Sequence, residues 1–248
     1  MIALLSDFQE TAYAGVVKAV IYSENPKANI VDIQHNILPQ NILQAAWILK
    51  TSYLFFPKKT IFVCVVDPGV GGKRKNIAIE TKNYWFIGPN NGCLYEAIKQ
   101  DEIKQVYEII IKNNWLVSNT FHGRDIYAKV AGQIDQGNKK ALKKIPEQEL
   151  ERLEFFQKEH TGQIVNIDGY GNIITNVPTL NKKEYKVSYD GMEALIDFHK
   201  KYESAEEELF LITGSNNTLE FSIKNGSALN KFEVILAKAE IGKKIKIE

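Results

Sequence analysis

The chain has 248 residues, of which 44% are hydrophobic and 25% are charged, a globular composition with ample apolar content for a buried core. Its 31 basic and 30 acidic residues leave a net charge of +1, which argues against general nucleic-acid binding. Neither a membrane span nor a targeting segment is recognisable in the sequence, so a cytoplasmic protein is expected. Two cysteines do not make a disulfide scaffold, and Cys64, inside an apolar run, is predicted to be a buried core thiol.

Apolar patterning in the first part of the chain predicts strands that alternate with helices. Strands are predicted over residues 2–6, 30–33, 60–66, 77–80, 85–87 and 106–110, and helices over residues 11–23, 39–56, 92–99 and 123–133. This alternation is typical of α/β proteins with a mostly parallel sheet. It predicts a Rossmann-like α/β domain.

The pattern changes after the polar stretch 138–158. Short alternating runs separated by Gly, Asn and Asp turns follow, among them GQIVNIDGYGNIITNV, EYKVSYDG, LFLITGSNN, LEFSIKNG and FEVILA. Such runs are typical of strands in a small all-β domain. The sequence therefore predicts two domains, residues 1–157 and residues 158–248.

The segment from Asp67 to Arg74 follows the apolar strand predicted over 60–66. In open α/β sheets, ligands bind beyond the carboxyl ends of strands, and the glycines of DPGVGGKR allow a close approach of the backbone to a ligand. A plain β-turn with a capping Asp is about equally plausible from this segment alone. Neither the Walker A pattern nor GxGxxG is satisfied, so the segment does not predict a phosphate cradle.

Three other segments place polar or aromatic residues where ligands often bind. Asp7 follows the first strand, where a carboxylate can hold a ribose, although an N-cap is the alternative. Thr120, Phe121 and His122 precede a predicted helix; a lone histidine is more often structural, and Arg124 and Asp125 can simply cap that helix. Spacing alone makes the segment from Asp168 to Asn172 a hairpin turn.

In this order, the segments SDF, DPGVGGKR, GPNNG, FHGRD and DGYGNIITN, with the C-terminal run GSNNTLEFSIKNGSA, resemble the S-adenosylmethionine hydroxide adenosyltransferases. That family is related to the fluorinases and chlorinases. The resemblance implies an N-terminal α/β domain, a C-terminal β-barrel that completes a nucleoside site, and hydrolysis of S-adenosyl-L-methionine to adenosine and methionine. It also implies a homotrimer whose sites lie between the N-terminal domain of one subunit and the C-terminal domain of its neighbour.

The resemblance also assigns roles to individual residues. It implies a catalytic set of Asp67, Arg74 and His122, which the halogenating relatives lack, and so favours water over halide. Neither a metal nor a separate cofactor is expected, because S-adenosylmethionine is the substrate. The implied substrate-binding residues are Asp7, Thr120, Phe121, Asp168, Tyr170, Asn172, Ser215, Lys224 and Asn225.

The chain departs from the family's pattern at several positions. Gln9 stands where the family has Gly, and the second Asp of that loop is missing. Gln40, Asn41 and Asn90 also differ from the residues expected at their positions. The change at Gln9 and the missing Asp bear on the contacts to the methionine end of the substrate, and the other departures bear on substrate affinity or scope.

Under this hypothesis Asp67, Arg74 and His122 hold a water in line with the carbon–sulfur bond, and either Asp67 or His122 takes its proton. Three other functions stay open. A non-catalytic binding protein would bind adenosine or S-adenosylmethionine without turnover. A methyltransferase would form S-adenosylhomocysteine, but the usual Gly-rich loop is absent. A halogenase would form 5′-halo-adenosine.

Overall fold

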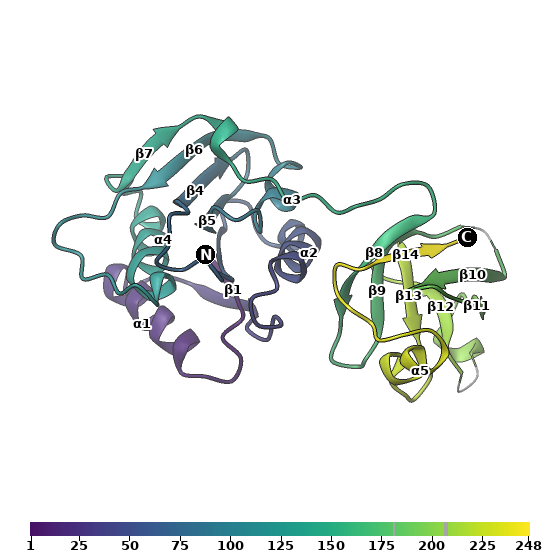
Figure 1. Ribbon diagram of the computed structural model, residues 1–248. Helices are drawn as coiled ribbons and strands as arrows, with labels where there is room; N and C mark the ends of the chain where they lie inside the picture. Colours follow the sequence, from purple (N-terminus) through teal and green to yellow (C-terminus); the bar gives the residue numbers. More distant parts are fainter. Residues whose placement is uncertain (181, 206–207) are drawn as a thin grey trace. The chain divides into compact units, whose positions relative to one another are not determined.

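The computed structural model of the chain describes residues 1–180, 182–205 and 208–248. The chain divides into two compact units, Met1–Glu154 and Phe155–Glu248, which are drawn in Figure 1. The domain boundary predicted after residue 157 stays a prediction.

The N-terminal unit is built on a seven-stranded sheet with the order β2-β1-β3-β5-β4-β6-β7. The strands are β1 (Ile2–Ser6), β2 (Ile30–Gln34), β3 (Ile61–Val65), β4 (Asn76–Thr81), β5 (Trp85–Pro89), β6 (Ile103–Ile109) and β7 (Leu142–Ile145). Strands β2, β1, β3 and β5 run parallel to one another, whereas β4, β6 and β7 pair antiparallel with their neighbours. The expectation of a mostly parallel sheet was therefore wrong for half of the pairings. Only three residues join β4 to β5, and so short a connection permits antiparallel pairing alone.

Helices cover both faces of this sheet (Figure 1). One face carries α1 (Tyr13–Glu24) and α4 (Ala128–Asp135), and the other carries α2 (Ile42–Ser52) and α3 (Tyr95–Ile98). The shorter helical segments are η1 (Tyr53–Phe55), the π-helix η2 (Gly123–Tyr127) and η3 (Glu147–Glu149). The predicted helix over 123–133 is thus a π-helical turn continued by an α-helix.

Alternate side chains of the central strands pack on opposite faces. Ile2, Leu4 and Val63 join the apolar cluster formed with α1 and α4, whereas Phe62 packs against Tyr53 on the other face, with ring centroids 6.4 Å apart. Because both faces are buried, these strands read as continuous apolar runs in the sequence. Cys64 within β3 is fully buried, so the prediction of a core thiol is confirmed.

The C-terminal unit is a nearly closed antiparallel barrel. Its strands are β8 (Thr161–Ile167), β9 (Ile173–Pro178), β10 (Glu184–Tyr189), β11 (Met192–Asp197), β12 (Phe210–Thr213), β13 (Thr218–Ser222) and β14 (Lys244–Ile247), in the order β11-β10-β14-β8-β9-β13-β12. A bridge between Phe198 and Leu211 brings the two edge strands together. The predicted fold class, an α/β unit followed by a β-barrel, is confirmed.

One segment of the barrel unit departs from its prediction. The run FEVILA, expected to be extended, belongs largely to helix α5 (Ala228–Ile235). Ala228, Phe232 and Leu236 are all buried, and this four-residue spacing is that of one helix face. A 3₁₀ turn, η4 (Tyr202–Ser204), precedes β12.

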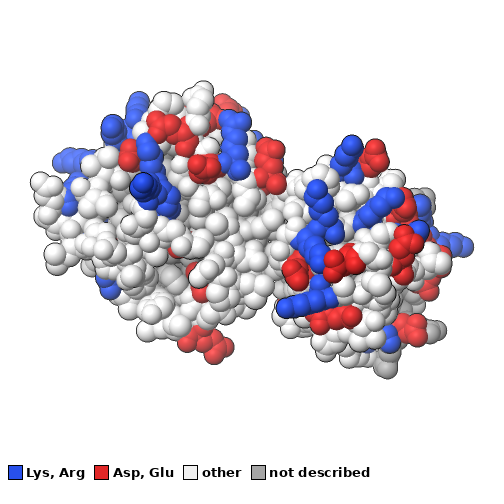
Figure 2. All heavy atoms as spheres, in the orientation of Figure 1, with Lys and Arg blue, Asp and Glu red and all other residues white. Residues whose placement is uncertain are grey.

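Charged side chains of both signs lie close together on the surface. On the face shown in Figure 2, they gather on the N-terminal unit near β6 and β7, where Lys75 pairs with Glu108 and Glu149, and Lys139 pairs with Glu80. Within the described ranges, no helix is long and apolar enough to cross a membrane.

Candidate active site

The turn between β3 and β4 brings Arg74 back to Asp67. Two successive backbone hydrogen bonds, from Val70 N to Asp67 O and from Gly72 N to Gly69 O, reverse the chain. Gly71 has φ +74°, and a Cβ there would lie 2.3 Å from the carbonyl oxygen of Asn119, so only glycine fits. The Asp67 carboxylate is not used to cap this turn; it receives two hydrogen bonds from the Arg74 guanidinium.

The Asp67–Arg74 pair is bidentate and nearly buried. Arg74 Nε donates to Asp67 Oδ1 over 2.6 Å, and Arg74 Nη2 donates to Asp67 Oδ2. The side chain of Asp67 is only 6% exposed, and that of Arg74 only 11%. Such planar fork-to-fork pairing fixes the orientation of both groups.

His122 completes this cluster from the start of η2. Its Nδ1 lies 2.9 Å from Arg74 Nη2. Burial and the guanidinium of Arg74 lower the pKa of His122, while the nearby carboxylates of Asp67 and Asp125 act in the opposite direction. Because arginine can only donate, Nδ1 must accept, and the neutral imidazole then carries its hydrogen on Nε2.

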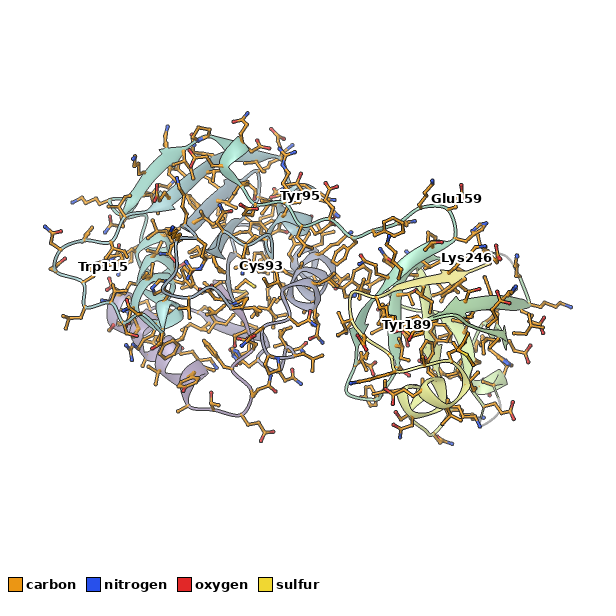
Figure 3. The ribbon with its side chains drawn as sticks, in the orientation of Figure 1. Cys93, Tyr95, Trp115, Glu159, Tyr189 and Lys246 are labelled. Atoms are coloured by element: carbon orange, nitrogen blue, oxygen red, sulfur yellow. The ribbon has the colours of Figure 1, made fainter. Side chains whose placement is uncertain are left out.

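The long connection between β6 and η2 is anchored before it reaches His122. Trp115, labelled in Figure 3, packs against the core between Lys112 and Lys129. Further along, Ser118 N donates to Asp125 Oδ2 over 2.8 Å, and Arg124 pairs with the same carboxylate. Asp125 therefore holds the loop in front of its helix, in addition to its predicted place in the first turn of that helix.

Asp7 lies at the carboxyl end of β1, as predicted. Its Oδ2 accepts a hydrogen bond of 2.8 Å from Gln40 N, and it is not the N-cap of α1, since Ala12 holds that position. Gln9 and Gln40 have φ angles of 55° and 66°, and Gln9 Nε2 donates to Ile37 O over 2.5 Å. Gln9 and Gln40, which both differ from the family pattern, therefore connect the loop after β1 to the loop after β2 by hydrogen bonds.

Asn41 and Asn90 have structural partners as well. Asn41 caps α2 by accepting from Gln44 N over 2.9 Å. Asn90 donates to Glu149 O and accepts from Glu151 N. Both side-chain amides therefore form hydrogen bonds with backbone groups of the N-terminal unit.

A small cavity adjoins the cluster of Asp67, Arg74 and His122. Its volume is about 120 Å³, and an adjoining hollow measures about 310 Å³. The first is lined by Asp7, Phe8, Val65, Asp67, Val70, Thr120, Phe121, His122 and Gly123, and the second by Asp7, Phe8, Tyr13, Thr120 and Phe121. The structure thus brings five predicted residues to the cavity beside Arg74: Asp7, Asp67, Thr120, Phe121 and His122.

Phe8 and Tyr13 are lining residues that we did not predict. The ring of Phe121 lies 5.6 Å from that of Phe8 and 5.1 Å from that of Tyr13, both edge to face. Tyr13 is 51% exposed. These rings form an aromatic wall that can contact a base or an aliphatic chain.

The C-terminal unit has a separate pocket of about 560 Å³. It is lined by Asp168, Tyr170, Asn172, Tyr202, Ile223, Asn225 and Gly226. Asp168 Oδ1 accepts from the backbone amides of Tyr170 and Asn172, and Oδ2 accepts from Asn172 Nδ2. The hairpin turn expected from spacing is therefore present, and its side chains line a pocket.

Not every predicted barrel residue reaches this pocket. Ser215 is exposed in the turn after β12 and is absent from the lining. Lys224 Nζ donates to Glu203 O over 3.4 Å. Tyr202 was missed by sequence reasoning; its hydroxyl lies 3.0 Å from Glu220 Oε1 and 2.9 Å from Ser222 Oγ.

The cavity is lined by two carboxyl side chains and an imidazole, and the guanidinium of Arg74 lies beside it, hydrogen-bonded to Asp67 and His122. Across the described part of the chain, no group of three or more His, Cys, Asp or Glu is arranged to hold a metal ion. The predicted absence of a metal and of a cofactor stays a prediction.

Comparisons with known proteins agree along both units. Residues 2–145 match the family model described as the SAM hydroxide adenosyltransferase N-terminal domain, and residues 162–239 match that of the C-terminal domain. The chain is 32% identical to a protein of Methanocaldococcus jannaschii named (R)-S-adenosyl-L-methionine hydrolase, over 90% of this chain and 88% of that one. It is 24% identical to a fluorinase of Nocardia brasiliensis, over 76% of this chain and 75% of the fluorinase.

Solved structures have the same fold. An uncharacterized conserved protein from Thermotoga maritima superposes with a TM-score of 0.89, at 30% identity and over 100% of both chains. A conserved hypothetical protein from Thermus thermophilus superposes with a TM-score of 0.82, at 26% identity.

Proposed function

The chain belongs to the SAM hydroxide adenosyltransferase family, and from that premise we propose that it is an enzyme that hydrolyses S-adenosyl-L-methionine to adenosine and L-methionine. The observation that carries the proposal is the contact of Asp67, Arg74 and His122 beside a cavity that Asp7 also lines. A binding protein would need Asp7 but not this cluster.

The substrate is a sulfonium cation with a neutral thioether leaving group. Water attacks the ribose C5′ on the side opposite sulfur, the C5′–S bond breaks, and its electron pair stays on the sulfur of methionine. The water loses one proton, so one proton is released for each molecule hydrolysed. Holding the water in line supplies much of the rate gain, since effective molarities reach roughly 10⁵–10⁸ M.

We assign the proton acceptor to Asp67. The basic nitrogen of His122, Nδ1, faces the guanidinium of Arg74, so a proton could be added there only against a positive charge. The N–H on Nε2 remains to donate a hydrogen bond to the water. The Asp67 carboxylate accepts from Arg74 at both oxygens and keeps further lone pairs for the water.

We assign the rest of the substrate to the neighbouring residues. Asp7 binds the ribose hydroxyls, while Thr120, Phe121 and the rings beside them enclose the sugar and base. The pocket of the C-terminal unit, with Asp168, Tyr170, Asn172 and Asn225 in its lining, completes the nucleoside site, and Ser215 and Lys224 are its outer contacts. A homotrimer with sites shared between subunits, and a location in the cytoplasm, stay predictions.

Hydrolysis in ¹⁸O-water tests the proposal. The purified protein is incubated with S-adenosylmethionine, and the products are analysed by mass spectrometry. We expect adenosine with ¹⁸O at the 5′ position and an equal amount of methionine. Asp67→Asn should lower kcat by about 10²–10⁴-fold, whereas Asp190→Asn, which removes a surface carboxylate paired with Lys243, should not change it.

Other products would identify another function. Intact substrate that remains bound after long incubation would indicate a binding protein. S-adenosylhomocysteine would indicate methyl transfer. A 5′-halo-adenosine formed on addition of fluoride or chloride would indicate the reaction of the more distant relatives named fluorinases.

A further inference from the structure

Arg74 has a contact that the catalytic set does not explain. Besides Asp67 and His122, its Nη1 donates to Asn76 Oδ1 over 2.5 Å. The same oxygen accepts from the hydroxyl of Tyr127 over 2.7 Å. The guanidinium is thus held on three sides, by a carboxylate, an imidazole and an amide.

Both residues are inside the protein. Tyr127 is 0% exposed and Asn76 is 8% exposed. Burial raises the pKa of Tyr127 well above its ordinary value, and the charge of Asp67 adds to this effect, so the hydroxyl keeps its proton and donates. Because arginine has only donors, the Asn76 atom that faces it must be the amide oxygen, and this oxygen receives both hydrogen bonds.

The location of the pair in the fold links the two elements that carry the catalytic residues. Asn76 is the first residue of β4, two positions after Arg74, and Tyr127 is the last residue of η2, five positions after His122. A π-helical turn closes at i to i+5, as the bond from Ala128 N to Gly123 O does here, and such turns are frequent at functional sites. The distance between Arg74 and His122 depends on how β4 and η2 are held together, and the Asn76–Tyr127 hydrogen bond joins those two elements.

We propose that Asn76 and Tyr127 are positioning residues that set the orientation of Arg74 toward His122 and Asp67. This inference rests on the proposed hydrolysis for its kinetic readout, but not for its spectroscopic one. Tyr127 acts through Asn76, and Asn76 acts through Arg74. Neither residue lines the cavity.

The kinetic test is a double-mutant cycle. Asn76→Ala should lower kcat by about 10- to 100-fold with KM nearly unchanged, because a small misplacement of catalytic groups affects the transition state most. Tyr127→Phe should lower kcat by a smaller factor, and should have no further effect when Asn76 is already Ala. Tyr84→Phe is the matched control: it removes a buried hydroxyl bonded to Phe56 O in the same unit, and kcat should stay at its wild-type value.

The spectroscopic test is an NMR titration of the imidazole of His122, assigned by its loss in His122→Gln. The charged groups around this ring are Arg74, Asp67 and Asp125. Asn76→Asp adds a carboxylate against Arg74 that offsets its positive charge, so the pKa of His122 should rise. It should also rise in Asn76→Ala, where the guanidinium is less firmly held against the ring.

The outcomes separate the inference from the proposed function. Additive losses in the cycle, or variants that lower only Tm while kcat and the His122 titration stay at wild type, would overturn the positioning role. If the wild-type protein makes no adenosine, hydrolysis is wrong, and the titration alone then decides whether Asn76 and Tyr127 orient Arg74.

Discussion

At the scale of single residues, Arg74 is the group that brings the candidate site together. It donates to Asp67 through Nε and Nη2, to Asn76 through Nη1, and to His122 through Nη2. Four of the five N–H groups of a guanidinium are therefore used. An ammonium group cannot reproduce this planar arrangement, because it is a point charge with three donors.

Arg74→Lys should therefore be a severe change despite keeping the charge. We expect kcat to fall by about 10²–10³-fold, as when an electrostatic contact to reacting groups is removed. Adenosine release measured under saturating substrate checks this. Arg152→Lys is the control, since Arg152 lies over the ring of Tyr95 and outside the lining of every cavity described. A lysine variant with nearly full activity would show that charge alone is enough at position 74.

The protonation state of His122 predicts a pH dependence. Burial and Arg74 lower its pKa from the ordinary value of 6.5, so the ring stays neutral in the folded protein at pH values where it would be charged in the unfolded chain. Activity should be constant above pH 6.5 and should fall as the pH drops through the lowered pKa, because an imidazolium would repel Arg74.

The same shift affects stability with a defined sign. The unfolded chain binds more protons at this histidine, so the contribution of His122 to the free energy of unfolding should rise with pH between the lowered pKa and 6.5 and should be constant above it. His122→Asn keeps an acceptor for Arg74 and removes the titration. In that variant the acid limb of the rate profile should move to lower pH; an unchanged limb would assign the titration to another group.

At the scale of elements, the contact between η2 and β3 sets the position of His122. Gly123 begins η2, and a Cβ at this residue would lie 2.7 Å from Val65 Cγ1 and 3.4 Å from Phe8 Cζ. The helix therefore packs on the end of β3 at a distance that only glycine allows. The same contact holds His122, the residue before Gly123, at the cavity that Asp67 also lines.

Gly123→Ala tests this contact. The added methyl should displace η2, lower stability by about 1–3 kcal/mol, and lower kcat beyond what the loss of folded protein explains. Urea unfolding and activity are measured on the same samples. Gly15→Ala in α1 is the matched control: a Cβ there meets nothing within 4 Å, so the change should be neutral or stabilising by up to about 1 kcal/mol. Equal behaviour of the two variants would mean that the close packing is unimportant.

The elements also show how far sequence reasoning reaches. Strands β1 and β3 were predictable because burial on both faces makes them apolar almost throughout, and Asp7 and Asp67 were found because they follow these strands. The contact of Asn76 with Tyr127 was not predictable, since it depends on how β4 and η2 pack and leaves no pattern in either segment. Helix α5 was misassigned because the first residues of FEVILA alternate between apolar and polar side chains. The helical spacing of its buried residues appears only when Ala228 is included.

At the scale of the whole molecule, the N-terminal and C-terminal units each contain a cavity with different chemistry. The cavity of the first is lined by Asp7, Asp67 and His122 beside Arg74, and the pocket of the second is lined by Asp168 together with tyrosines and amides. The family resemblance implies that one substrate occupies both the cavity and the pocket. It implies that one subunit of a trimer supplies the cavity and a neighbouring subunit supplies the pocket. The resemblance to this family could be found from ordered motifs, but no single motif indicates whether two subunits share a site.

Mixing two inactive variants tests shared sites. Asp67→Asn affects the N-terminal unit, and Asn172→Ala affects the C-terminal pocket. Co-expressed, the two should regain about a quarter of wild-type activity, the fraction of sites that random assembly of a closed trimer leaves intact. The control is co-expression of two copies of the same variant, which should regain no activity. If each site were formed within one chain, mixing would restore nothing, and ultracentrifugation would then report the assembly separately.

The hydrogen bond between Asn76 and Tyr127 also has an evolutionary consequence. An apolar residue in place of Asn76 would leave the buried Tyr127 hydroxyl without its acceptor, at a cost of about 1–3 kcal/mol. Sequence drift at one position is therefore constrained by the other. Among homologues, an apolar residue at position 76 should be accompanied by phenylalanine at position 127, so that the two positions are inherited as a pair while Asp67, Arg74 and His122 beside them stay the same.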